Sequence, residues 1–239
     1  MAAGRLRLFA AAVVVVATAT GLAAPPAGAR KKTAVKPLQG TAALLRSHKV
    51  VSAPRSGASR LGTVAASGTL TGGRTVLPVI RRTKGKGPWL KVMLPGRPNG
   101  HKGWIAQRGT KLGKTSWHVV VRTSSRQIDV YRKGRLARTL AAIVGKPSTP
   151  TPQGQFFVEE SVRMFPGSPG WPFALALSAR SNVLQEFEGG PGQIGIHGVA
   201  NIGGTLGSAV SHGFIRVADE SSAWLAARIA PGVPVTIRS

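Results

Sequence analysis

The chain has 239 residues, enough for one large domain or two modest ones, and its 31 glycines, 17 prolines and 42% hydrophobic residues indicate a loop-rich globular protein. It contains no cysteine, which excludes disulfides, cysteine-ligated zinc and a thiol nucleophile. The formal net charge is +26, and residues 30–115 carry 19 lysines and arginines without a single acid. A segment so basic attracts polyanions.

The first 29 residues have the pattern of a signal peptide. Arg5 and Arg7 precede an apolar run from Leu8 to Ala24, and the small residues 27–29 offer a cleavage site before Arg30. An uncleaved membrane anchor is the alternative, because a run of about 17 residues is near the lower limit for spanning a bilayer. The weak hydrophobicity of the run favours cleavage. We therefore expect an exported, extracytoplasmic protein at the cell wall or cell surface, which meets the membrane only through this segment if it is uncleaved.

The middle of the chain predicts a linker and then a small β module. Residues 30–47 are basic and weakly patterned, which is typical of a linker. Between residues 48 and 110, short β-rich runs recur at intervals of about 8–12 residues, which predicts a small antiparallel barrel. These runs are HKVVSAP, RLGTVAASGTL, RTVLPVIRR, PWLKVML and KGWIAQ.

A polar connector, GTKLGK at 109–114, leads into a second β-rich domain over residues 116–239. One helix is expected there, with Asp219 as its N-cap and Pro231 and Gly232 ending it. Residues 233–238 alternate as a closing strand. The fold class predicted is mostly β (α+β). The strand runs are WHVVVRT, QIDVYR, RLARTLAAIVG, GQFFVEE, FALALSA, QIGIHG and FIRVA.

Two His-Gly pairs suggest a site for acyl transfer. His197 ends one strand run, and the Ser-His-Gly of residues 211–213 leads into the run that begins at Phe214. A residue at position 214 would face His197 across adjacent strands, and Gly213 would let backbone N–H groups approach a developing oxyanion. Such a site needs a nucleophile at position 214, and phenylalanine offers none.

Other chemistries fit the sequence poorly. A relocated nucleophile at Ser211 would need a base with an orienting acid, and no Asp or Glu is near His197 in sequence. No metal or cofactor is expected, because the histidines lack the paired spacing of a ligand set. Nucleic acid is not the expected partner, because no aromatic residues interleave with the basic ones. The five histidines are His48, His101, His118, His197 and His212.

The pattern HG…SHG-x-IR resembles the active-site signature of the L,D-transpeptidases, whose YkuD-type domain remodels bacterial peptidoglycan. The Thr-Pro-Thr-Pro segment at 149–152, followed by Gly154 and a strand, resembles the family's structural turn, and WHVVVR with QIDVYRKGRL resembles its opening hairpin. The likeness covers about residues 116–239. It implies a YkuD-like β-sandwich or barrel with one helix in the C-terminal region. Residues 89–105 resemble the small SH3-like modules of bacterial walls.

The resemblance implies a role for each site residue. His197 would be the general base and acid partner, and Ser211, His212 and Gly213 would shape the nucleophile corner. Phe214 occupies the position of the family's acyl-carrying cysteine. Arg216 would bind the carboxylate-rich stem peptide of peptidoglycan.

Three functions are compatible with these residues. The first is a relative with impaired or absent catalysis that binds peptidoglycan stem peptides or regulates an active homologue. The second is an active transpeptidase, with Phe214 a sequence error or compensated elsewhere. The third is a charge-driven binder of anionic wall polymers or nucleic acid.

Overall fold

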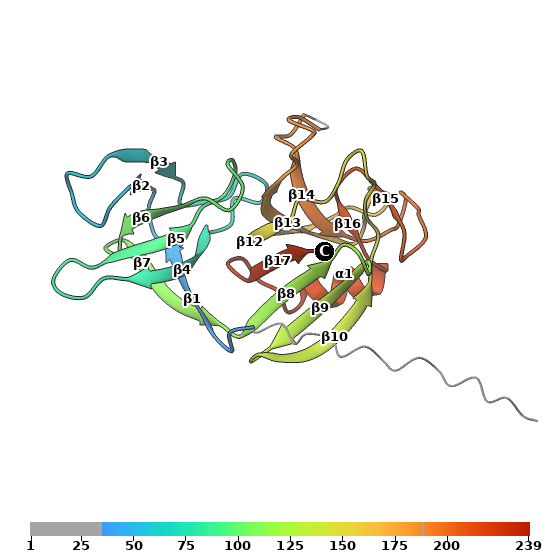
Figure 1. The fold of residues 1–239 in the computed structure, drawn as a ribbon, viewed down its shortest axis with the longest axis horizontal. Helices are drawn as coiled ribbons and strands as arrows, with labels where there is room; N and C mark the ends of the chain where they lie inside the picture. The colour runs from blue at the N-terminus through green and yellow to red at the C-terminus, as the bar shows by residue number, and fades with distance from the viewer. Residues whose placement is uncertain (1–34, 188) are drawn as a thin grey trace, which may run out of the picture. The chain divides into compact units, whose positions relative to one another are not determined.

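The computed structural model describes residues 35–187 and 189–239. The predicted signal peptide lies outside these residues. The described strands form two large sheets and one small one (Figure 1). The chain is mostly β, as predicted.

The first large sheet is built from strands of residues 39–115 and is antiparallel throughout, in the order β3-β2-β6-β5-β4-β1-β7. Gly and Pro separate the short runs, and the successive strands β2 with β3, β4 with β5 and β5 with β6 pair directly. The likeness of this module to SH3 domains stays a prediction. Its strands are β1 (Gln39–Leu44), β2 (His48–Val51), β3 (Arg60–Val64), β4 (Val76–Arg82), β5 (Trp89–Met93), β6 (Lys102–Ala106) and β7 (Thr110–Thr115).

Strand β1 corrects the prediction of a linker at residues 39–44, while residues 30–34 of that prediction lie outside the described residues. It lies between β4 and β7 and pairs with both in antiparallel register. Ala42 and Leu44 are fully buried in the core of the first sheet, which gives this segment the apolar contacts that a linker lacks.

The second large sheet has the strand order β10-β9-β8-β17-β12-β13-β14-β16. The pairs β8–β17 and β14–β16 are parallel, and the other neighbours are antiparallel. A separate small parallel pair is formed by β11 (Val144–Gly145) and β15 (Ala209–Ser211). In the chain, β11 follows β10 and β15 precedes β16. The sheet's strands are β8 (Trp117–Arg122), β9 (Gln127–Arg132), β10 (Arg135–Ala141), β12 (Gly154–Arg163), β13 (Phe173–Arg180), β14 (Gln193–His197), β16 (Ile215–Arg216) and β17 (Pro234–Arg238).

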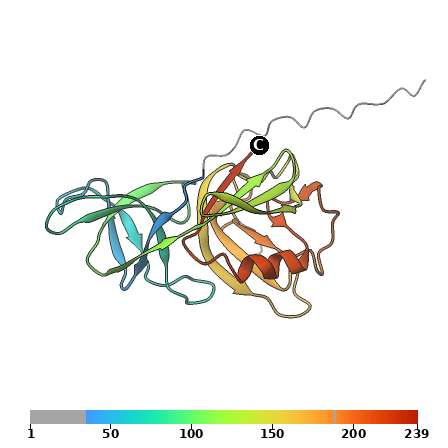
Figure 2. The same ribbon diagram turned by 90° about the horizontal axis from the view of Figure 1, so that it is seen from below.

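The helix α1 (Asp219–Ala226) packs against β13 and β14 (Figure 2). The predicted N-cap is wrong by one residue, because Ala218 is the cap and makes no side-chain hydrogen bond. The carboxylate of Asp219 instead accepts hydrogen bonds from the backbone N–H groups of Val199 and Ala200, at 2.8 and 3.0 Å. Asp219 thus holds the loop that follows β14 through these two hydrogen bonds.

Strand β12 contributes to two hydrophobic cores. Phe156 and Val158 belong to the core under the second sheet, and Phe157, which points to the opposite face, belongs to the core of the first. Successive side chains of a strand point to opposite faces, so one strand can contribute to both cores.

Within the described part of the chain, no helix is long and apolar enough to cross a bilayer.

Candidate ligand-binding site

The parallel pairing of β14 with β16 places His197 directly beside Arg216. Both side chains are buried, with 8% of their surface exposed. The ring nitrogen Nδ1 of His197 lies 2.8 Å from the carbonyl oxygen of Gly198, so the tautomer that donates from Nδ1 leaves Nε2 as an acceptor. The two residues that the sequence placed in one site are therefore neighbours.

The turn before β16 is held internally by Ser211. Its hydroxyl donates to the carbonyl of Phe214 at 2.6 Å and accepts from the N–H of Gly213 at 3.1 Å. The residue is fully buried and does not line the cavity. Ser211 thus shapes the corner, and its hydroxyl is not placed to act as a nucleophile. The N–H of Gly213 is likewise engaged inside the turn.

The Thr-Pro-Thr-Pro segment, which follows β11, links that strand to this turn. Thr151 Oγ1 donates to the carbonyl of Gly213 and accepts from the N–H of Gly145, each at 2.9 Å. Thr149 Oγ1 donates to the carbonyl of Ser211 at 3.3 Å. The turn that the sequence predicted is therefore a support for the corner at residues 211–214, in addition to leading into β12.

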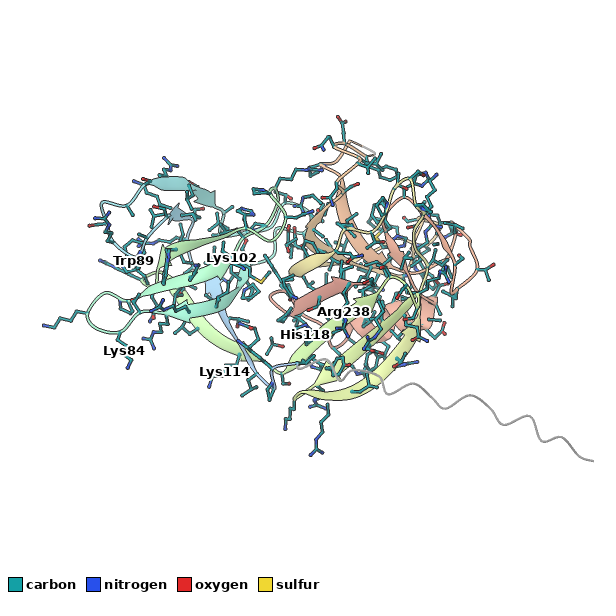
Figure 3. The ribbon with its side chains drawn as sticks, viewed as in Figure 1. Lys84, Trp89, Lys102, Lys114, His118 and Arg238 are labelled. Atoms are coloured by element: carbon teal, nitrogen blue, oxygen red, sulfur yellow. The ribbon has the colours of Figure 1, made fainter. Side chains whose placement is uncertain are left out.

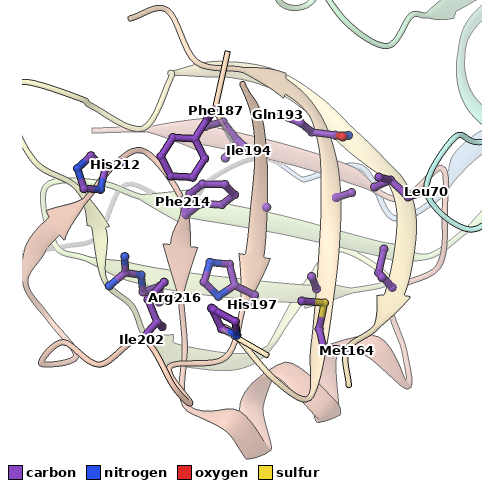
Figure 4. A pocket seen from close by; sticks show the side chains of 15 residues that line it. Leu70, Met164, Phe187, Gln193, Ile194, His197, Ile202, His212, Phe214 and Arg216 are labelled. Atoms are coloured by element: carbon purple, nitrogen blue, oxygen red, sulfur yellow. The ribbon is translucent and has the colours of Figure 1, made fainter. Parts of the chain in front are cut away.

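The side chain of Phe214 lies among aromatic rings. Its ring centroid is 5.4 Å from that of His197 and 5.5 Å from that of Phe187. Phe187 in turn stacks on the exposed His212, with centroids 6.0 Å apart. The Nε2 of His212 accepts a hydrogen bond from Lys146 at 3.3 Å, which places a cation at this end of the site. Figure 4 shows Phe214 between Phe187 and His197.

These residues line a cavity of about 620 Å³. That volume is in the range of pockets that hold small ligands. Glycine, glutamine, histidine and arginine complete a wall that is otherwise apolar, and no acidic side chain lines the cavity among the described residues. The apolar lining residues are Leu70, Val162, Met164, Pro169, Ala174, Ala176, Phe187, Ile194, Ile202 and Phe214.

The electrostatics of the cavity favour an anion. Burial lowers the pKa of His197, a hydrogen bond to Gly198 opposes this in part, and the charge of Arg216 lowers the pKa further. His197 is therefore neutral at neutral pH, whereas Arg216 keeps its charge although burial lowers its pKa too. The Nη1 of Arg216 donates to the carbonyl of Gly203 at 3.3 Å, and its buried Nε has no protein partner. Arg216 thus supplies a positive charge to the cavity wall, which suits a carboxylate.

Several residues of the site carry no signal in the sequence motifs. Phe187, Met164 and Ile202 come from loops or strand ends, and Leu70 comes from the first sheet's segment of the chain. No motif spacing links them to His197.

Within residues 35–187 and 189–239, no three potential ligands gather into a metal-binding group.

Comparison with known proteins identifies the second domain. The family model of the L,D-transpeptidase catalytic domain, YkuD, matches residues 116–237. YkuD of Bacillus subtilis is 31% identical over 121 residues, which are 51% of this chain and 65% of that protein. L,D-transpeptidase 1 of Mycobacterium tuberculosis is 30% identical over 130 residues, 49% of each chain. The chain thus aligns with less than two thirds of the length of these relatives.

Two solved structures of L,D-transpeptidases were also compared with the chain. An L,D-transpeptidase from Mycobacterium tuberculosis superimposes with a TM-score of 0.45 at 17% identity, covering 82% of this chain and 96% of that one. The catalytic domain of the Enterococcus faecium L,D-transpeptidase gives a TM-score of 0.38 at 21% identity, covering 51% and 95%. With the family model covering half of its length, the chain belongs to the L,D-transpeptidase (YkuD) catalytic domain family.

Proposed function

We propose that this protein is an exported member of its family that binds peptidoglycan stem peptides without forming an acyl-enzyme. One observation carries the proposal: the ring of Phe214 packs against His197 in a chain without cysteine. The resemblance of residues 211–216 to the family signature assigns position 214 to the nucleophile. A phenyl ring can neither attack an amide nor be deprotonated. Ser211 does not replace it, because its hydroxyl is buried in the turn.

The binding role is supported by the remaining features of the cavity. Arg216 lines the cavity, and its charged, planar guanidinium suits a peptide carboxylate. The apolar walls suit the methyl and methylene groups of a peptide. Relatives of this chain are named L,D-transpeptidases, and the peptidoglycan partner is carried over from that family.

The test combines sedimentation with mass spectrometry. The chain without residues 1–29 is mixed with insoluble peptidoglycan stripped of anionic polymers, and we expect it to sediment with the wall, whereas Arg216→Met stays in the supernatant. The same protein is incubated with imipenem, which is bound in a solved structure of a relative. We expect no mass increase. An adduct on the wild-type chain would overturn the non-acylating role and favour the active-transpeptidase alternative.

A second candidate, binding of anionic wall polymers, is favoured by the charge of residues 35–115. This segment has 16 lysines and arginines and no acid, and none of them forms an ion pair in the described structure. The hairpin between β4 and β5 presents exposed Arg81, Arg82, Lys84 and Lys86, and Figure 3 shows Lys84 extending away from the sheet. An exposed cationic hairpin of this kind attracts polyanions through long-range forces that salt screens.

The polymer candidate is tested on an immobilised polyphosphate column with a salt gradient. We expect Lys84→Ser/Lys86→Ser to elute at lower salt than the wild type, whereas the matched control Lys133→Ser/Arg135→Ser, on exposed residues of the second domain, elutes unchanged. Equal shifts for both pairs would mean that net charge alone governs retention.

A further inference from the structure

The tip of a hairpin from the first sheet's segment reaches the cavity of the second domain. Leu70 lies between β3 and β4 and lines the cavity together with Val162 and Met164. It is nevertheless 54% exposed, so it remains accessible to a ligand. Figure 4 shows it across the cavity from Arg216 and His212.

A buried carboxylate fixes this hairpin tip. Glu160 of β12 is 5% exposed and accepts hydrogen bonds from the N–H of Leu70 at 3.0 Å and the N–H of Thr71 at 2.8 Å. The hydroxyl of Thr71 donates to the same carboxylate at 2.6 Å. Burial alone would raise the pKa of Glu160, but these hydrogen bonds lower it overall, so the carboxylate is charged at neutral pH. Charge-assisted hydrogen bonds are the strong ones.

The backbone of the tip is shaped for this contact. The carboxylate of Glu160 lies so close to Gly68 that a Cβ there would collide with it. The N–H of Gly68 donates to the carbonyl of Gly73 at 2.8 Å, which closes the tip around the acid. The hydrogen bonds to Glu160 therefore fix the position of Leu70 at the cavity.

We propose that Leu70 is a ligand-contacting residue of the cavity and that Glu160 positions it, so that residues 39–115 take part in peptide recognition. This inference rests on the proposed peptide-binding function. The carboxylate of a stem peptide binds Arg216, and its chain runs along the apolar wall until its aliphatic groups pack on Leu70. The cavity is thus incomplete without the first sheet's segment.

The test measures the affinity of the full chain, without residues 1–29, for soluble muropeptides from muramidase-digested peptidoglycan. Leu70 is about half exposed, so only part of its apolar contact is lost on truncation, and we expect Leu70→Ala to bind about five- to tenfold more weakly. The matched control is Leu61→Ala, a leucine of β3 that is 56% exposed and does not line the cavity. It should bind as the wild type does. Equal affinities for Leu70→Ala and wild type would overturn the inference and leave the proposed function standing.

A double-mutant cycle tests the positioning role of Glu160. Glu160→Gln should weaken muropeptide binding in the wild-type chain and have no further effect on binding in Leu70→Ala, because its influence passes through Leu70. Thermal unfolding of all variants monitors the fold. Equal weakening by Glu160→Gln in both backgrounds would overturn the positioning role, since a general structural effect does not depend on Leu70.

A dye experiment separates this inference from the proposed function. If the wild-type chain binds no muropeptide, the proposed function fails, and titration with 1-anilinonaphthalene-8-sulfonate, an apolar anion, then decides the role of Leu70. Weaker dye binding by Leu70→Ala than by Leu61→Ala supports Leu70 as a wall of the site. Equal binding, or no binding by the wild type, overturns it.

Discussion

The ring of Phe214 meets the imidazole of His197 nearly edge to face, with 5.4 Å between the centroids and 67° between the planes. Aromatic pairs prefer this geometry, so the contact stabilises the corner in addition to filling it. The backbone around it is held by Ser211 and Thr151, whose hydrogen bonds do not involve the side chain at position 214. The side chain can therefore change while the frame is kept.

This independence predicts that Phe214→Cys can be acylated. His197 is neutral at neutral pH and lies beside position 214, so it can accept the proton of a thiol there. We expect imipenem to add to Phe214→Cys and to leave the wild type unmodified, as measured by intact-protein mass spectrometry.

The control for that experiment is Phe187→Cys, which places a thiol in the same cavity without contact to His197. It should react much more slowly. Similar rates for the two cysteines would show that His197 does not activate position 214, and no reaction of either would mean that the frame no longer supports acylation.

Replacing Arg216 should separate binding from stability. A hydrogen-bonded charge pair lost from a buried site costs about 1.5–3 kcal/mol, so Arg216→Met should bind muropeptides about ten- to a hundredfold more weakly. Its thermal unfolding should change little, because the buried Nε has no protein partner and the hydrogen bond from Nη1 to Gly203 is long, at 3.3 Å. Arg216→Lys should bind with intermediate affinity. Unchanged binding by Arg216→Met would exclude a carboxylate at this residue.

Thr151→Val should destabilise the corner at residues 211–214. It leaves the N–H of Gly145 and the carbonyl of Gly213 without their partner, at a cost of about 1–3 kcal/mol in the free energy of unfolding. Urea unfolding measures this loss. The exposed Thr205→Val is the matched control and should unfold like the wild type. Equal stability of the two variants would mean that the Thr151 bridge contributes nothing.

The pH dependence of stability should depend on His118. Burial lowers its pKa from 6.5 to about 4, and its Nε2 lies 2.8 Å from the hydroxyl of Thr236. The unfolded chain therefore binds a proton at higher pH than the folded chain, so stability is lost as the pH falls from about 6.5 through about 4. His118→Gln should lose less stability than the wild type between about pH 7 and pH 5, as followed by urea midpoints. An identical loss in both would contradict the prediction.

Much of the architecture could be predicted because it depends on local sequence patterns, namely short β-rich runs separated by turn residues. His197 ends one strand run and Phe214 begins another, which predicted that they lie on adjacent strands, and the pairing of β14 with β16 confirms that these strands are neighbours. The roles assigned to the site residues stay predictions. Asp219 illustrates what local rules miss: its residue type suits a helix cap, but two loop N–H groups compete for the same carboxylate.

The contribution of Leu70 could not be predicted from the sequence for a related reason. An exposed leucine in a glycine-rich turn has no periodicity to interpret, and its partner Glu160 is 90 residues away in the chain. Strand β1 was missed because its apolar residues are mostly alanine, whose burial depends on pairing with both β4 and β7. Both features arise from long-range contacts.

The two-sided packing of β12 limits how the protein can be divided. Phe157 is 1% exposed and belongs to the core of the first sheet, although it lies within the residues that the family model matches. A fragment that starts at residue 116 would present this ring to water, together with the carboxylate of Glu160. Such a fragment would expose an apolar patch prone to association. Trimming this protein to its family domain would therefore alter the very domain that the trimming aims to isolate.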